Sequence, residues 1–92
     1  MIKTFVHKGL EAFFRKGTKA GIQPVHADKL RRLLAQLDQS ASALDMNVPG
    51  WRLHELQGEH AGSWSVTVNG NWRVVFKFED GDAVLVDYLD YH

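Results

Sequence analysis

Hydrophobic positions near the start of the chain predict a strand followed by a short helix. Met1–Val6 is rich in β-branched and aromatic residues, which is typical of a short strand. Lys8–Lys16 carries one apolar stripe with helical spacing, formed by Leu10, Phe13 and Phe14. Gly17 then suits the left-handed conformation that ends many helices.

A second, longer helix is predicted from Pro24, because proline fits the first helical position, where its missing N–H has no partner anyway. The apolar positions of this helix repeat with a helical period and comprise Ala27, Leu30, Leu33, Leu34 and Leu37. We expect Ser40 to cap one further turn through about Asp45. His7 and His26 lie in this helical half and are expected at the surface.

From Trp51 onward the hydrophobic period changes to two, which indicates strands. The predicted strands are Trp51–Leu56, Ser63–Val68, Trp72–Phe78 and Asp82–Tyr91. Asn69-Gly70 and Asp80-Gly81 are typical of type I′ turns and join the last three strands as hairpins. Helices followed by consecutive hairpins predict one α+β domain over residues 1–92, with two main helices packed on a mainly antiparallel sheet.

The alternation also assigns the two faces of the sheet. Trp64, Val66, Trp72, Val74 and Phe76 share the parity expected to pack on the helices. The opposite parity, expected to face solvent, carries Ser63, Ser65, Thr67, Arg73, Val75 and Lys77. A solvent-facing sheet surface with an arginine and a lysine is suited to an anionic polymer.

Charge is divided along the chain although the net charge is zero. Residues 1–37 carry eight Lys or Arg against two acids, a balance of +6, and the remainder carries three against nine, a balance of −6. Basic clusters bind phosphates, but they are also typical of solvated helix surfaces. The candidate RNA- or ribosome-binding residues are Lys8, Arg15, Lys16, Lys19, Arg31, Arg32, Arg52 and Lys77.

Composition narrows the class of protein further. The chain has no cysteine, which removes disulfides and thiolate metal sites. It has no apolar run of about 18 residues and no signal-peptide pattern, so we expect a soluble cytoplasmic protein. His54 and His60 are six residues apart with a glycine between them, which excludes a zincin motif. We expect neither a metal nor another cofactor.

The remaining residue types fit metal-free cleavage of RNA. Such a reaction needs a base for the ribose 2′-hydroxyl, an acid for the departing 5′-oxygen and a cation for the phosphorane. His54 and His92 suit the proton transfers, and Arg73 suits the phosphate. Asp90 can orient an imidazole, and Tyr91 can hydrogen-bond the phosphate. A structural histidine at position 54 is the alternative.

Several short motifs resemble the HigB toxins of the RelE superfamily. They run along essentially the whole chain and are Met1–Lys3, Lys8–Leu10, Leu53–Gly58, Gly62–Val66, Asn71–Val74 and the terminal Asp90-Tyr91-His92. The resemblance implies a RelE-like fold and catalytic roles for His54, Asp90, Tyr91 and His92, with Arg73 on the phosphate. Gln57 and His60 depart from the family pattern, which has a lysine and commonly an arginine at these positions.

The function that this resemblance implies is that of a toxin in a type II toxin–antitoxin pair. Such a toxin enters the A site of the 70S ribosome and cuts mRNA there by 2′-hydroxyl attack. The implied partner is a HigA-like helix-turn-helix antitoxin, through which alone the toxin contacts operator DNA. The alternative is a catalytically weak binding module that acts mainly in the antitoxin complex and in operon autoregulation, which the uncharged Gln57 and His60 favour.

Overall fold

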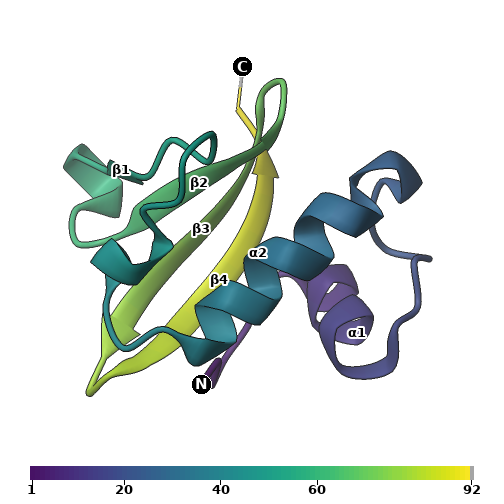
Figure 1. Ribbon diagram of the computed structural model, residues 1–92, viewed down its shortest axis with the longest axis horizontal. Coiled ribbons are helices and arrows are strands. Elements are labelled where there is room, and N and C mark those ends of the chain that lie inside the picture. The colour runs from purple at the N-terminus through teal and green to yellow at the C-terminus, as the bar shows by residue number, and fades with distance from the viewer. Residues whose placement is uncertain (92) are drawn as a thin grey trace.

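The computed structural model describes residues 1–91 and has an α+β architecture, as the sequence predicts (Figure 1). Two helices, α1 (Lys8–Lys16) and α2 (Ala27–Gln39), pack on one side of a sheet with strand order β1-β2-β3-β4. All neighbouring strands are antiparallel, and the bounds of the strands are His54–Glu55, Trp64–Asn69, Trp72–Glu79 and Asp82–Asp90. In the part of the chain that is described, no helix is long and apolar enough to cross a membrane.

Both predicted helices are confirmed, and their ends follow from local hydrogen bonds. At the start of α1 the His7 Nδ1 accepts the N–H of Leu10 at 3.0 Å, and at its end Gly17 has φ 78°. A 3-10 turn over Pro24–His26 leads into α2. The further turn predicted after α2 is present as a 3-10 turn, Ala43–Met46.

The cap of that further turn was predicted wrongly. Ser42 and Asp45 form the capping box, in which each side chain accepts from the other's backbone N–H. Ser40 lies two residues earlier, at the end of α2, and its hydroxyl donates to the Gln36 carbonyl at 2.7 Å. The prediction chose the first serine, whereas the chain leaves α2 at Ser40 in an extended conformation before turning again.

The two hairpin turns differ. Asp80 and Gly81 have φ 53° and 83°, so both central residues have the positive φ that a type I′ turn requires. In the first hairpin Asn69 still pairs with Trp72, so the turn is formed by Gly70 and the residue after it. Among the residues of this turn only Gly70 has positive φ, at 56°, and the predicted type I′ turn at Asn69-Gly70 is therefore wrong.

Two predicted strands are much shorter than expected. The strand expected over Trp51–Leu56 is reduced to His54–Glu55, because Arg52 adopts φ 54° and breaks the extended backbone. The N-terminal segment forms isolated parallel bridges to β4, Ile2 with Ala83 and Phe5 with Val86. The Thr4 hydroxyl next to these bridges accepts the N–H of Leu85, the residue at a bulge in β4, at 2.8 Å.

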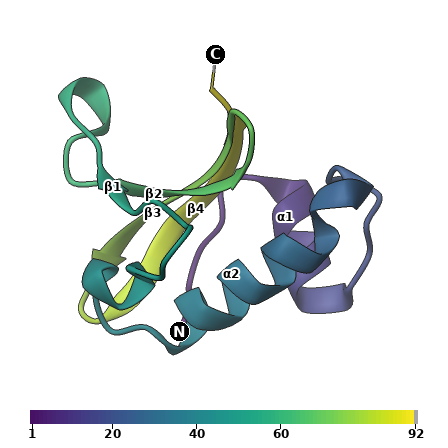
Figure 2. The same ribbon diagram turned by 45° about the horizontal axis from the view of Figure 1, so that its top comes forward.

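The core lies between the helices and the predicted face of the sheet. Leu30, Leu33, Val66, Val74 and Phe76 are fully inaccessible to solvent. In Figure 2 the two helices lie on one side of the sheet, and the turn after β1 extends away from them. This turn and β1 therefore form a surface that is separate from the helix layer.

Two predictions about exposure require correction. The surface of the sheet away from the helices is partly covered, since Ser63, Ser65 and Val75 are buried. His26, expected at the surface, is only 3% exposed. It turns inward from the 3-10 turn before α2, and its Nδ1 lies 2.6 Å from the Tyr88 hydroxyl. A polar residue can occupy the core when its hydrogen bond is satisfied in this way.

Candidate active site

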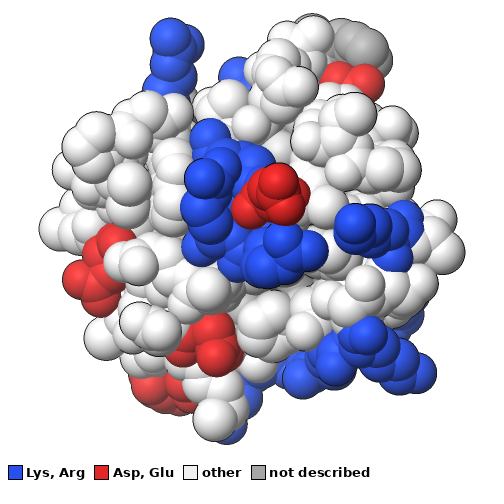
Figure 3. Space-filling view, turned by 45° about the vertical axis from the view of Figure 1, so that its right-hand side comes forward, with Lys and Arg blue, Asp and Glu red and all other residues white. Residues whose placement is uncertain are grey.

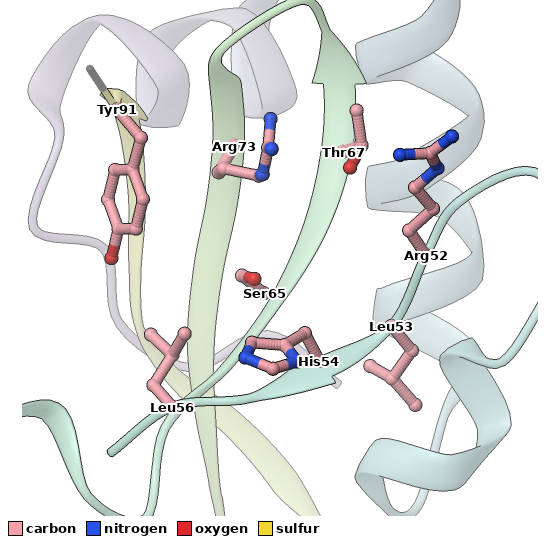
Figure 4. Close-up of a pocket in the computed structure, with 8 residues that line it drawn as sticks. All are labelled: Arg52, Leu53, His54, Leu56, Ser65, Thr67, Arg73 and Tyr91. Carbon is pink, nitrogen blue, oxygen red and sulfur yellow. The ribbon is translucent and has the colours of Figure 1, made fainter.

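A solvent-open cavity of about 470 Å³ lies on the side of the sheet that faces away from the helices (Figure 4). Side chains from β1, β2 and β3 and from the residue after β4 surround it. Its lining residues are Arg52, Leu53, His54, Leu56, Ser65, Thr67, Arg73 and Tyr91. Three of the five residues predicted to be catalytic thus meet around one space, which sequence spacing alone could not establish.

His54 reaches the cavity from β1, the shortest strand. It pairs with Ser65 of β2, and the strand is held further by the Leu56 N–H, which donates to the Ser63 carbonyl at 2.9 Å. His54 is exposed, and Figure 4 shows its ring between Leu53 and Leu56, on the side of the cavity that β1 forms. Its position therefore combines access for a substrate with an apolar surrounding on two sides.

Arg73 enters the cavity from the middle of the sheet. Its neighbours across the ladder are Thr67 of β2 and Leu89 of β4. The guanidinium Nη1 donates to the carbonyl oxygens of Gly70 at 2.8 Å and Trp72 at 3.2 Å. These bonds fasten the cation to the β2–β3 turn and leave its other nitrogens available for an anion.

Tyr91 and Asp90 behave differently although they are adjacent. The Tyr91 N–H donates to the Asn71 carbonyl at 2.8 Å, and its ring lines the cavity. Asp90 pairs with Trp72, whose ring packs against His26 on the helix side of the sheet. Because side chains alternate along a strand, Asp90 has the opposite parity from Tyr91, and it does not line the cavity. His92 lies outside the described residues.

The predicted nucleic-acid-binding cations are divided between two surfaces. Lys8, Arg15, Lys16, Lys19, Arg31 and Arg32 belong to α1, α2 and the segment between them. Figure 3 shows lysines and arginines gathered on the side of the molecule that carries the helices. Two of these arginines are in helical ion pairs, Arg15 with Glu11 at 3.1 Å and Arg31 with Asp28 at 2.9 Å.

Of the remaining two predicted cations, Arg52 lines the cavity, whereas Lys77 lies on β3 beside Gly62. The helical cations therefore do not extend the cavity, and a role for them in binding RNA stays a prediction. Gln57 and His60 are exposed at the 3-10 turn after β1 and do not line the cavity, although Gln57 directly follows the lining residue Leu56.

Sequence reasoning did not identify the walls of the cavity. Leu53 and Leu56 form its apolar sides, and neither was predicted to be part of a site. A period of two places Leu56 on the face of His54 but Leu53 on the opposite face, so the alternation gave no signal for both. Their significance depends on the bend at Arg52, which turns this segment along the sheet and was not predictable from the pattern.

The arrangement has a definite chemical capacity. An imidazole, a fixed guanidinium and a phenol converge on a space that is open to solvent and large enough for part of a polymer. These groups can exchange a proton, bind a phosphate and donate a hydrogen bond, respectively. Among residues 1–91 no group of three or more His, Asp or Glu side chains is placed to hold a metal ion.

Comparison with known proteins is consistent along the whole chain. Residues 3–92 match the family model described as the RelE-like toxin of type II toxin–antitoxin system HigB. The chain is 40% identical to the endoribonuclease HigB of Proteus vulgaris over 92 residues, covering all of both proteins. It is 34% identical to toxin HigB-1 of Vibrio cholerae serotype O1 over 94 residues, covering all of this chain and 98% of that protein. The chain therefore belongs to the HigB family of RelE-like toxins.

Proposed function

We propose that this chain is an endoribonuclease toxin that cuts mRNA in the A site of the ribosome and thereby inhibits translation. The observation that carries the proposal is the convergence of His54, Arg73 and Tyr91 on one open cavity. The name of the Proteus relative, an endoribonuclease, supports the same activity over the full length of the chain.

The proposed reaction uses the ribose 2′-hydroxyl as the nucleophile. A base removes its proton, the 2′-oxygen attacks phosphorus, and the bond from phosphorus to the 5′-oxygen breaks. An acid protonates that oxygen, leaving a 2′,3′-cyclic phosphate and a 5′-hydroxyl. We assign the base to His54 and stabilisation of the phosphorane to Arg73, whose attachment to the β2–β3 turn holds its charge in place before the substrate arrives.

The acid is assigned to His92, with Tyr91 as the alternative, since the phenol lines the same cavity as His54. Asp90 is proposed to orient the terminal imidazole. Its parity places it away from the cavity, so in this role it would act on His92 and not on the RNA. The order of the two proton transfers is set by which group holds the proton when the RNA binds.

The scarcity of cations at the cavity supports the proposed dependence on the ribosome. Arg52 and Arg73 are the cations that line it, and the helical cations lie on the other side of the sheet. Two cations cannot by themselves hold a flexible RNA in line for attack. We propose that the ribosome supplies this alignment, which also places the activity in the cytoplasm.

The proposed protein partner is a HigA-like antitoxin with a helix-turn-helix, because the family is defined by type II toxin–antitoxin systems. Contact with operator DNA would occur only through that partner. The exposed, uncharged Gln57 beside the cavity favours a second candidate function, a weakly active toxin whose main role is in this complex.

The test is cleavage of an mRNA with and without programmed ribosomes. We expect cutting by the wild-type protein only with ribosomes, and losses of at least about a hundredfold in His54→Ala and Arg73→Ala. Lys29→Ala on α2 is the matched control, because it also removes a long side chain but lies away from the cavity. Efficient cutting of free RNA would exclude ribosome dependence, and wild-type rates in folded His54→Ala would exclude the proposed base.

A further inference from the structure

The backbone at Arg52 is in a conformation that arginine rarely adopts. Its φ is 54°, in the left-handed region where a β-carbon crowds the backbone. The backbone directly before it is fixed, since the Trp51 carbonyl accepts the Thr67 N–H at 2.7 Å and the Trp51 N–H donates to the Val48 carbonyl at 3.0 Å. Glycine would occupy this position without strain, yet the chain has arginine here.

The Arg52 side chain lines the cavity, and all its hydrogen-bond donors are available to a ligand. Among residues 1–91 the Arg52 guanidinium has no hydrogen-bond or ion-pair partner. The other cation of the cavity, Arg73, has both hydrogens of Nη1 directed at carbonyl oxygens of the β2–β3 turn. Figure 4 shows Arg52 on the Thr67 side of the cavity and Tyr91 on the opposite side, with Arg73 between them.

A strained, exposed cation at the edge of a reaction site indicates a role in function, since strain of this kind persists where the surrounding structure imposes it. We propose that Arg52 is a substrate-positioning residue that binds a backbone phosphate of the RNA next to the scissile one. The scissile phosphate lies at Arg73, between His54 and Tyr91. Arg52 then holds the adjacent phosphodiester on the Thr67 side. This inference rests on the proposed nuclease function.

The chemistry favours a phosphate over a base as the ligand. A guanidinium with five free donors binds phosphate oxygens in a two-pronged geometry that the side chain presents without reorganisation. The flanking side chains at this end of the cavity, Thr67 and Leu53, include no aromatic ring on which a base could stack. A phosphate contact away from the reacting atoms strengthens binding of substrate and transition state alike, so its loss raises the half-saturating concentration and leaves the maximal rate nearly unchanged.

The experiment combines variants of Arg52 with mRNAs in which one phosphate at a time is replaced by a neutral methylphosphonate. Single-turnover cleavage on programmed ribosomes gives a maximal rate and a half-saturating toxin concentration for each pair. We expect Arg52→Gln to raise the half-saturating concentration about fivefold to tenfold, with the maximal rate within about twofold of wild type. Arg52→Lys should recover part of the loss, and Lys29→Gln, which removes one charge from α2, should have no effect.

The decisive outcome is non-additivity at one phosphate. At that position the methylphosphonate should raise the half-saturating concentration of wild type as much as Arg52→Gln does. In the Arg52→Gln variant the same methylphosphonate should raise it no further. Losses that multiply at every position, or a loss confined to the maximal rate, would overturn the assignment. Arg52→Gly should show the same binding defect with a melting temperature no lower than wild type, and a large fall in melting temperature would show that Arg52 is structural.

A second measurement separates this inference from the proposed function. Binding to ribosomes programmed with mRNA that has a 2′-deoxyribose at the cut position requires no cleavage. If wild type binds there more tightly than Arg52→Gln but cuts no unmodified mRNA, the phosphate contact stands and the nuclease proposal fails. If wild type cuts mRNA and Arg52→Gln equals it throughout, the nuclease stands and the role of Arg52 fails. Absence of wild-type binding would overturn both.

Discussion

The buried pair of His26 and Tyr88 allows a sharp test of what holds the two layers together. The Gln23 N–H donates to the Tyr88 hydroxyl oxygen at 3.3 Å, and the hydroxyl lies 2.6 Å from His26 Nδ1. Because burial lowers the pKa of His26 and favours the neutral ring, we assign the hydroxyl hydrogen to Nδ1 and the ring proton to Nε2. The bond joins β4 to the segment before α2, and we predict that Tyr88→Phe weakens this connection.

The magnitude follows from what the substitution leaves behind. Phenylalanine keeps the ring that packs on Trp72 at a centroid distance of 4.6 Å, so little apolar contact is lost. His26, which is 3% exposed, loses the donor to its Nδ1. An unpaired acceptor at a buried site costs about 1–3 kcal/mol, and we expect a loss of about 2 kcal/mol. For a domain of this size that corresponds to a fall in melting temperature of roughly 8–16 °C.

The assay is urea unfolding followed by tryptophan fluorescence at pH 7.5, where His26 is neutral. Tyr91→Phe is the matched control, because within residues 1–91 its hydroxyl has no hydrogen-bond partner and the free energy of unfolding should change by less than about 0.5 kcal/mol. A Tyr88→Phe protein as stable as wild type would refute the reasoning. It would show that water or a shift of His26 replaces the lost hydroxyl.

The same pair predicts how stability depends on pH. Burial lowers the pKa of His26 below its usual value of 6.5. As the pH falls below about 6.5, His26 binds a proton in the unfolded chain more readily than in the folded chain. The contribution of neutral, buried His26 to the free energy of unfolding is therefore fully present above that pH and decreases below it. His26→Gln keeps an acceptor for Tyr88 but cannot titrate. Its loss of stability between pH 7.5 and 5.5 should be smaller than that of wild type, and equal losses would assign the pH dependence to other groups.

Three further changes test other parts of the chain. Gly9→Ala should lower the free energy of unfolding by about 1–3 kcal/mol, measured by urea unfolding, because a β-carbon at Gly9 would lie 2.5 Å from the Gly21 carbonyl oxygen. An unchanged midpoint would mean that the two segments separate at little cost. Gln57→Lys should raise the single-turnover rate on programmed ribosomes roughly fivefold, since it adds a cation beside the cavity. A fall in rate would show that another group already has this role. Deletion of His92 should abolish cleavage while leaving antitoxin binding intact in a pull-down, and wild-type cleavage by the deletion would remove His92 from the mechanism.

The fold was largely predictable because its signals are local and repeated. The apolar stripe of α2 and the alternation of β2 and β3 persist for several residues, so a single exception does not obscure them. Apart from the local errors at the Ser40 cap and the Asn69-Gly70 turn, what failed depends on contacts between distant segments. Ile2 and Phe5 form bridges to Ala83 and Val86 of β4, and the buried His26 contacts the hydroxyl of Tyr88, which lies 62 residues later in the sequence.

The site was predictable in residue type but not in arrangement. His54, Arg73 and Tyr91 were identified from the chemistry they can perform and from the resemblance, and the structure brings them around one cavity. The parity of Asp90 could have been read from the last strand, where it is adjacent to Tyr91. The left-handed backbone at Arg52 leaves no trace in the pattern, since sequence alone predicts such a conformation mainly at glycine or asparagine.

The start of β3 connects the most buried polar pair of the fold to the site. Trp72 packs on Tyr88 from the helix side, while the next residue, Arg73, points to the cavity and holds the Gly70 carbonyl. The preceding residue, Asn71, uses its carbonyl to fix the backbone of Tyr91. Three consecutive residues thus act on neighbouring parts of the site. Asn71 and Trp72 hold the end of β4, and Arg73 is the cation of the cavity. The relative position of Arg73 and Tyr91 therefore depends on the Trp72–Tyr88 packing on the helix side of the sheet as well as on the hydrogen bonds of the turn.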